Sequence, residues 1–182
     1  MRPTTDKVKG AIFSMLDAQA FRRAEEDGDD GFPFRRVLDL YAGTGALGIE
    51  ALSRGSEHCD FVESNARARA TIEENLRRTG LEQQGSVHAL RAENAVSTFR
   101  APYDLILADP PYADPALPVL LATIGASGII HERTLLVIEH ARSVELPTEP
   151  GRLHLSRSRY HSTTAITLYA SGASDVGTPP KP

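Results

Sequence analysis

The sequence predicts an α/β fold, with a mostly parallel sheet of seven strands that ends in an antiparallel hairpin. Three observations predict it. Short apolar runs alternate with amphipathic helical stretches between residues 36 and 139. A glycine-rich turn directly follows the first apolar run, as in open parallel sheets that bind nucleotides. Two β-rich segments, 152–159 and 163–169, then follow one another across a short turn near 160–162, which is typical of a hairpin.

The first element is expected to be a helix over residues 5–20, because apolar residues recur there at helical spacing and Thr4 or Thr5 can cap it. A charged, glycine-containing loop is expected at 22–33. Strands are predicted at 36–41, 58–62, 86–91, 103–108 and 134–139, with helices between them at 46–54, 65–79, 93–99 and 115–125. Ser64 or Asn65 is expected to cap the 65–79 helix, and Gly80 to end it. Strands separated by helices imply right-handed crossovers in a parallel sheet.

The 182 residues suffice for one domain, which we expect to span 1–170, while the small, polar, proline-rich 171–182 segment is expected to be a disordered tail. No apolar run reaches the length of a membrane span, and the N-terminus lacks the apolar core of a signal peptide. The single cysteine, Cys59, excludes an internal disulfide and a cysteine-rich metal site. We therefore expect a cytoplasmic, monomeric protein without a metal or membrane partner.

The segment from Val37 to Gly48 predicts a nucleoside-binding loop. Gly43 and Gly45 allow positive φ and a close ligand approach, and the following helix begins with unpaired N–H groups. Glu63, at the end of the second strand, is placed to accept hydrogen bonds from ribose hydroxyls. Tyr41 adjoins the loop. After the third strand, Asn94 or its neighbour Glu93 could contact an adenine edge, although Asn94 could equally be a helix N-cap.

Two cofactors compete for this loop, because the Gly43-x-Gly45-x-x-Gly48 spacing is also typical of dinucleotide binding. Asp39 precedes the loop, where a carboxylate would repel a pyrophosphate but could serve the cationic end of S-adenosylmethionine through water or amide contacts. The sequence thus favours S-adenosylmethionine over NAD.

The tetrapeptide Asp109-Pro110-Pro111-Tyr112 supports the same choice. Two prolines give a stiff, extended turn directly after a buried strand. Asp109 and the Pro110 carbonyl could accept both N–H groups of an exocyclic amine, and Tyr112 could stack on the base. This arrangement suits methyl transfer to an amine and is foreign to hydride transfer.

Four stretches together resemble the bacterial 16S rRNA (guanine(966)-N(2))-methyltransferases. They are the run from Arg2 to Lys9, the Asp39–Gly45 segment, Asp109–Tyr112, and Arg159-Tyr160 before the final strand. The resemblance covers roughly residues 1–170. It implies a class I methyltransferase fold, S-adenosylmethionine as the donor, and a guanine of 16S rRNA or of the 30S subunit as the substrate. Arg2, Thr4 and Pro111 are candidates for holding that substrate; Arg2, Thr4 and Thr5 could instead close over the donor, and helix capping is the favoured role of the two threonines.

Two other functions stay open from the sequence. Asp-Pro-Pro-Tyr is shared with N6-adenine DNA methyltransferases, although no separate recognition domain is visible. A non-catalytic RNA-binding relative is the second alternative, because family members usually carry a further basic region ahead of the Arg-Pro-Thr run. The net charge of −4 argues mildly against nucleic-acid binding, but arginines cluster locally, most notably between residues 152 and 159.

Overall fold

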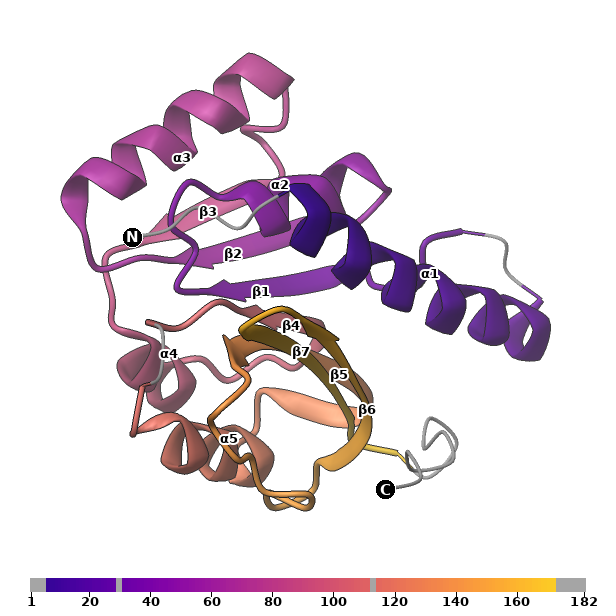
Figure 1. The fold of residues 1–182 in the computed structure, drawn as a ribbon. Helices are drawn as coiled ribbons and strands as arrows, with labels where there is room; N and C mark the ends of the chain where they lie inside the picture. Colours follow the sequence, from indigo (N-terminus) through magenta and orange to yellow (C-terminus); the bar gives the residue numbers. More distant parts are fainter. Residues whose placement is uncertain (1–5, 29–30, 112–113, 173–182) are drawn as a thin grey trace.

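The computed structural model describes residues 6–28, 31–111 and 114–172, and its centre is a seven-stranded sheet in the order β3-β2-β1-β4-β5-β7-β6 (Figure 1). The strands are β1 Arg36–Leu40, β2 His58–Val62, β3 Gly85–His88, β4 Tyr103–Ala108, β5 Ile130–Ala141, β6 His154–His161 and β7 Thr164–Ala170. The first five are mutually parallel, and β7 pairs antiparallel with both β5 and β6. The predicted fold class is confirmed.

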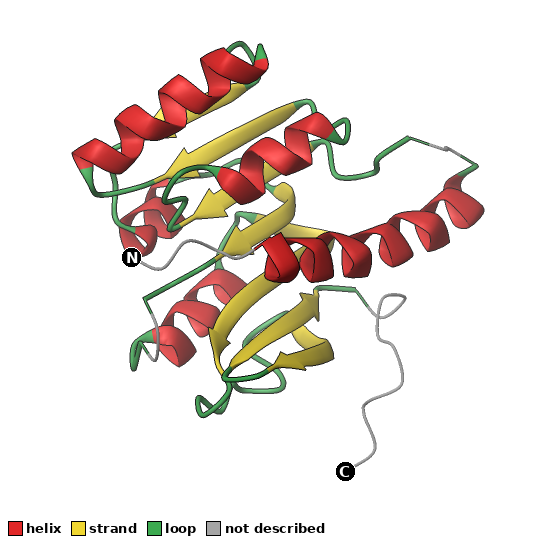
Figure 2. Ribbon diagram, turned by 45° about the horizontal axis from the view of Figure 1, so that its top comes forward, coloured by secondary structure: helices red, strands yellow, loops and turns green. Residues whose placement is uncertain are grey.

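Helices cover both faces of the sheet and divide its core in two. The helices are α1 Asp6–Asp27, α2 Ala46–Ser53, α3 Ala66–Thr79, α4 Ala92–Thr98 and α5 Leu117–Ala126. The apolar sides of α1, α2 and α3 pack on one face, and those of α4 and α5 on the other (Figures 1 and 2). Within the described ranges, no helix is both long and apolar enough to cross a membrane.

Helix α1 is longer than predicted, because the charged residues expected to form a loop continue it to Asp27. Arg23 explains part of this extension. Its side chain is buried, donates a 2.6 Å hydrogen bond to the Arg133 carbonyl, and lies over the Phe34 ring at 5.0 Å. The composition of 22–27 suggested solvent exposure, but a buried guanidinium with both a carbonyl and an aromatic partner holds this last part of the helix on the domain.

Other boundaries shift by a few residues. Strand β3 ends at His88 rather than at residue 91, so α4 begins at Ala92, and β5 extends beyond the predicted 134–139 at both ends. Asn65 caps α3 by accepting hydrogen bonds from the N–H groups of Arg67 and Ala68, and Gly80 ends the helix with a φ of 71°, both as predicted.

The terminal hairpin turns at Ser162 and Thr163, slightly later than predicted, since β6 continues to His161 and β7 begins at Thr164. Ser162 adopts a φ of 56° to make this two-residue turn. Ser171, which we expected in a disordered tail, donates its backbone N–H to the Thr134 carbonyl over 3.1 Å. The rest of the predicted tail, from residue 173, lies outside the described residues.

Candidate active site

The carboxyl edge of the sheet presents one row of side chains to a single cavity. The last row of cross-strand partners on the α1–α3 face, taken across β2, β1, β4 and β5, is Phe61, Asp39, Leu107 and Val137. Alternate residues of a strand point to the same face. Glu63, Asp109 and Glu139 lie two positions further along, whereas Tyr41 follows β1 with a φ of 60° and packs toward the α4–α5 face; all four line a cavity of about 980 Å³.

The glycine loop is held by the first carboxylate of this row. Gly43 and Gly45 have φ values of 57° and 80°, as the predicted turn requires. Glu63 is buried, and its two carboxylate oxygens accept hydrogen bonds from the backbone N–H groups of Gly43, at 2.9 Å, and Asn65, at 2.7 Å. Each carboxylate oxygen has more than one acceptor direction, so Glu63 can hold the loop and also accept from a ribose hydroxyl.

Asp39 supports the same loop from within the core. It is only 1% exposed and accepts a 2.9 Å hydrogen bond from the Gly48 N–H. Burial raises the pKa of Asp39 to about 7; the Gly48 hydrogen bond opposes this rise, while the charges of Asp109 and Glu63 add to it. Asp39 is not among the residues that line the cavity, so contact with a cofactor through water or amides stays a prediction.

Gly48 shows why this fingerprint needs a third glycine. A Cβ atom at that position would lie 2.3 Å from Cε1 of Phe61 and 2.7 Å from Sγ of Cys59. Cys59 is fully buried there, and burial raises the pKa of its thiol. The absence of a side chain at Gly48 therefore lets α2 approach β2 closely, which sets the position of the loop above the sheet.

The Asp109–Tyr112 motif begins directly beside the strand that leads into the glycine loop. The Asp109 N–H donates to the Leu40 carbonyl over 3.4 Å, which joins the ends of β4 and β1. Asp109 is half-buried, Pro110 is buried and Pro111 is exposed, and all three line the cavity. Tyr112, Arg2 and Thr4 lie outside the described residues, so the roles predicted for them stay predictions.

Four consecutive residues after the third strand, from Leu90 to Glu93, line the cavity, and Glu93 is the acidic one. It accepts a 3.4 Å hydrogen bond from the Tyr41 hydroxyl, whereas Asn94 is not among the cavity-lining residues. The N-cap of α4 is Arg91, so the capping interpretation of Asn94 is wrong. Of the two neighbours named from the sequence, the structure favours Glu93 for a contact with the donor.

The sequence analysis missed a second wall of the cavity. It is formed by Lys7 of α1, by Glu139 and His140 of β5, and by the hairpin turn from His161 to Thr164. Glu139 could have been found, because it directly follows an apolar run of four residues, 135–138, as Glu63 and Asp109 follow theirs. The hairpin turn gave no such signal, since its place beside the cavity depends on β7 lying between β5 and β6.

The charge of the cavity suits a cationic ligand. Its carboxylates are Glu63, Glu93, Asp109, Asp114 and Glu139, and its permanently charged cations are Lys7 and Arg91. Burial lowers the pKa of His140, which therefore adds no charge near neutral pH. An acidic wall attracts a sulfonium and disfavours a pyrophosphate, so this residue set fits S-adenosylmethionine better than a dinucleotide.

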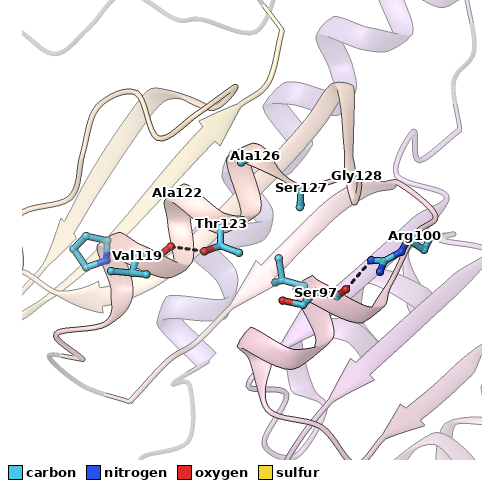
Figure 3. A pocket seen from close by; sticks show the side chains of 10 residues that line it. Ser97, Arg100, Val119, Ala122, Thr123, Ala126, Ser127 and Gly128 are labelled. Atoms are coloured by element: carbon cyan, nitrogen blue, oxygen red, sulfur yellow. Dashed lines mark hydrogen bonds between the residues drawn. The ribbon is translucent and has the colours of Figure 1, made fainter.

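A second hollow, of about 780 Å³, lies between α4 and α5 (Figure 3). Its charged lining residue is Arg100, whose guanidinium donates to the Ser97 carbonyl, and Thr123 donates its hydroxyl to the Val119 carbonyl. Its polar side chains are thus used within their own helix or the turn that follows it. Of the site residues named from the sequence, none that the structure describes is among those that line this hollow.

The fold is that of the class I methyltransferases, and two solved structures share it. A conserved hypothetical protein of Streptococcus pyogenes superimposes with a TM-score of 0.79 at 31% identity, over 92% of this chain and 97% of that one. A methyltransferase of Escherichia coli, yhhF, shares the fold with a TM-score of 0.76 over 95% of this chain and 89% of that one, at 24% identity.

The chain belongs to the family described as conserved hypothetical protein 95, whose model matches residues 1–170. YlbH of Bacillus subtilis strain 168, provisionally named an rRNA methyltransferase, is 39% identical over 92% of this chain and 86% of its own. Ribosomal RNA small subunit methyltransferase D of Escherichia coli strain K12 is 28% identical over 97% of this chain and 84% of its own. The family resemblance seen in the sequence is confirmed.

Proposed function

We propose that this protein transfers a methyl group from S-adenosylmethionine to the exocyclic N2 amine of a guanine in 16S rRNA. The observation that carries the proposal is that Glu63, Tyr41, Asp109 and Glu139 all line one cavity. A nucleoside-binding carboxylate and an amine-binding carboxylate then share one space. Its volume of about 980 Å³ lies at the upper end of ligand sites, as a cofactor plus a base requires. The names of the family relatives supply the substrate class.

The donor side of the cavity lies over β1 and β2. Glu63 would accept from the ribose hydroxyls, Glu93 would approach the adenine edge, and the loop at Gly43 and Gly45 would lie against the rest of the donor. The chemistry available with S-adenosylmethionine bound is transfer of its methyl carbon from a cationic sulfur to the amine nitrogen, which leaves a neutral thioether and a nitrogen that must lose one proton.

Asp109 and Pro110 bind and orient the amine of the base. A guanine N2 amine is a poor nucleophile, because its lone pair is conjugated with the ring. The Asp109 carboxylate and the Pro110 carbonyl would accept its two N–H groups, which turns the lone pair out of conjugation and stabilises the positive charge that develops on nitrogen. Asp109 is also placed to take the proton that the nitrogen loses, or to pass it to water.

Positioning supplies most of the rate gain in this scheme. Well-oriented reactants gain roughly 7–11 kcal/mol over a bimolecular encounter. The two prolines fix the backbone on which Asp109 is held, and the Asp109 N–H bond to Leu40 fixes it to the donor-side strand. Extruding the base costs a few kcal/mol, so the substrate guanine should lie in an accessible, weakly paired region of the RNA.

The test is to incubate the protein with labelled S-adenosylmethionine and 30S particles from cells that lack the modification, and then to map the labelled base. We expect label on the N2 of one guanine of 16S rRNA. In a parallel incubation with unmethylated duplex DNA, label on adenine N6 would replace the proposal with the DNA-modifying alternative. RNA binding without any label would favour a non-catalytic relative.

A further inference from the structure

An exposed aromatic residue with a stacked arginine lies at the end of the terminal hairpin. Tyr160 is 59% exposed, and the Arg142 guanidinium carbon is 5.0 Å from the centre of its ring. The Arg142 N–H donates a 2.8 Å hydrogen bond to the Thr163 carbonyl, which fixes the end of β5 to the hairpin turn. The pair is therefore attached to the framework of the domain at two points, and its position does not depend on a loose loop.

The pair is adjacent to the cavity. Tyr160 and His140 are both register partners of Ala165, so His140, Ala165 and Tyr160 form a row across β5, β7 and β6. Two strand spacings separate the ends of this row, or about 10 Å. His140 lines the cavity, as do His161 and Ser162, which directly follow Tyr160 in the chain. A nucleotide one or two positions from an extruded base can span this distance.

The charge of this region favours an anionic partner. Arg142 and Arg157 are exposed and Arg159 is half-buried, and none of the three has an ion pair within the described part of the chain. This arrangement contrasts with the acidic cavity beside it. A cationic surface that carries an aromatic ring, at the entrance of a site for a base, is the combination by which proteins hold single-stranded nucleic acid.

We propose that Tyr160 and Arg142 form a stacking platform for an unpaired nucleotide that flanks the target base in RNA. The proposal rests on the function proposed above, because it requires an RNA substrate. Tyr160 provides the face on which the flanking base stacks, and Arg142 orients the ring and adds positive charge near the phosphates. The platform binds and positions the RNA and does not touch the reacting atoms.

The experiment measures KM and kcat with undermethylated 30S particles, and the Kd for S-adenosylmethionine, for wild type and four variants. Tyr160→Ala should raise KM for the particles about 5- to 150-fold, which is the range for loss of one stacked base, while kcat and the donor Kd stay near wild type. Tyr160→Phe keeps the ring and should behave as wild type. Arg142→Ala should weaken RNA binding and reduce the slope of log K against log salt by about one.

Phe21→Ala is the matched control, because Phe21 is 66% exposed but lies on α1, outside the residues that line the cavity. It should leave KM unchanged. The platform is overturned if Tyr160→Ala has the KM of wild type, if Phe21→Ala shifts KM equally, or if Tyr160→Phe loses as much as Tyr160→Ala. A change in oligomeric state of Tyr160→Ala would instead assign the ring to a contact between copies of the chain.

Filter binding of the same particles separates this proposal from the function on which it rests. If wild type labels guanine and Tyr160→Ala labels it with equal KM, the platform alone is wrong. If wild type binds RNA but labels no guanine, the proposed function is wrong, and the binding constants of the variants still decide whether the platform exists. If wild type does not bind the particles, both proposals fail.

Discussion

Acidic residues have different surroundings on the donor side of the site, over β1 and β2, and on the substrate side, over β4 and β5. On the donor side, Asp39 and Glu63 are buried, and both accept hydrogen bonds from backbone N–H groups of the loop between Gly43 and Gly48 or the turn at Asn65. On the substrate side, Asp109 directly follows β4, Glu139 lies within the last three residues of β5, and both are half-buried. Sheet register brings three of these carboxylates, Glu63, Asp109 and Glu139, to one edge. They differ in burial: Glu63 is buried and holds the backbone, whereas Asp109 and Glu139 are half-buried and face the cavity.

The difference shows how each half is organised. The donor side is a backbone structure that carboxylates hold in place, so its shape is set before any ligand binds. The substrate side is a set of side chains directed into the cavity by strand ends, a proline turn and the hairpin. Removing a carboxylate should therefore alter donor affinity on the first side and the chemical step on the second, and the variants below separate these two effects.

The largest effect is expected for Asp109→Ala. Loss of the amine acceptor should lower kcat by at least about 100-fold, as for removal of one group that stabilises developing charge. The donor Kd should change little, because the glycine loop is held by other residues. Labelled methyl transfer and calorimetric donor binding measure the two quantities. A variant that still methylates at a rate near that of wild type would remove Asp109 from the mechanism.

Glu63→Ala should show the opposite pattern. It removes two charged acceptors from backbone N–H groups and the proposed ribose contact, so donor Kd should rise about 10- to 100-fold, since each charged hydrogen bond contributes about 1.5–3 kcal/mol before relaxation. Saturating donor should restore much of kcat. Glu57→Ala is the control, because Glu57 is an exposed carboxylate paired with Arg35. Unchanged calorimetric affinity for Glu63→Ala would reject the ribose assignment.

Much of the donor side could be predicted from the sequence, because its determinants are local. The glycines at 43 and 45 and the carboxylate at 63 lie within a single strand–helix–strand unit, and residue type alone indicates the turn and the strand end. The same holds for Asn65 and Gly80, whose capping roles depend on their own backbone. Between the neighbours Glu93 and Asn94 the sequence could not choose, because which of the two lines the cavity depends on how α4 packs on the sheet.

The substrate side was harder to predict, because its residues meet only through the sheet order. Glu139 lies beside Asp109 since β5 pairs with β4, and the 161–164 turn reaches the cavity since β7 pairs with β5. The Arg142–Tyr160 pair joins two segments that neither motif includes. Likewise, no local pattern predicted that Arg23 would be buried against Phe34 and the Arg133 carbonyl, which extends α1 beyond its apolar repeat.

The smallest expected effect concerns the pH dependence of stability on the donor side. Burial raises the pKa of Asp39 from 3.8 to about 7 in the folded protein. The folded state therefore binds this proton more tightly than the unfolded state, and the stability gained from protonation is complete below about pH 4 and lost as pH rises through about 7.

Asp39→Asn should remove this dependence, because an amide oxygen can still accept from the Gly48 N–H but does not ionise. Between pH 6 and pH 8, wild type should lose about 1 kcal/mol of unfolding free energy relative to the variant. Asp17→Asn, at an exposed position paired with Arg54, controls for a general charge effect. Urea unfolding at several pH values measures the difference. If the unfolding free energies of wild type and Asp39→Asn change with pH in parallel, Asp39 is ionised across this range. The buried carboxylate then supports the glycine loop as an anion rather than as a protonated acid.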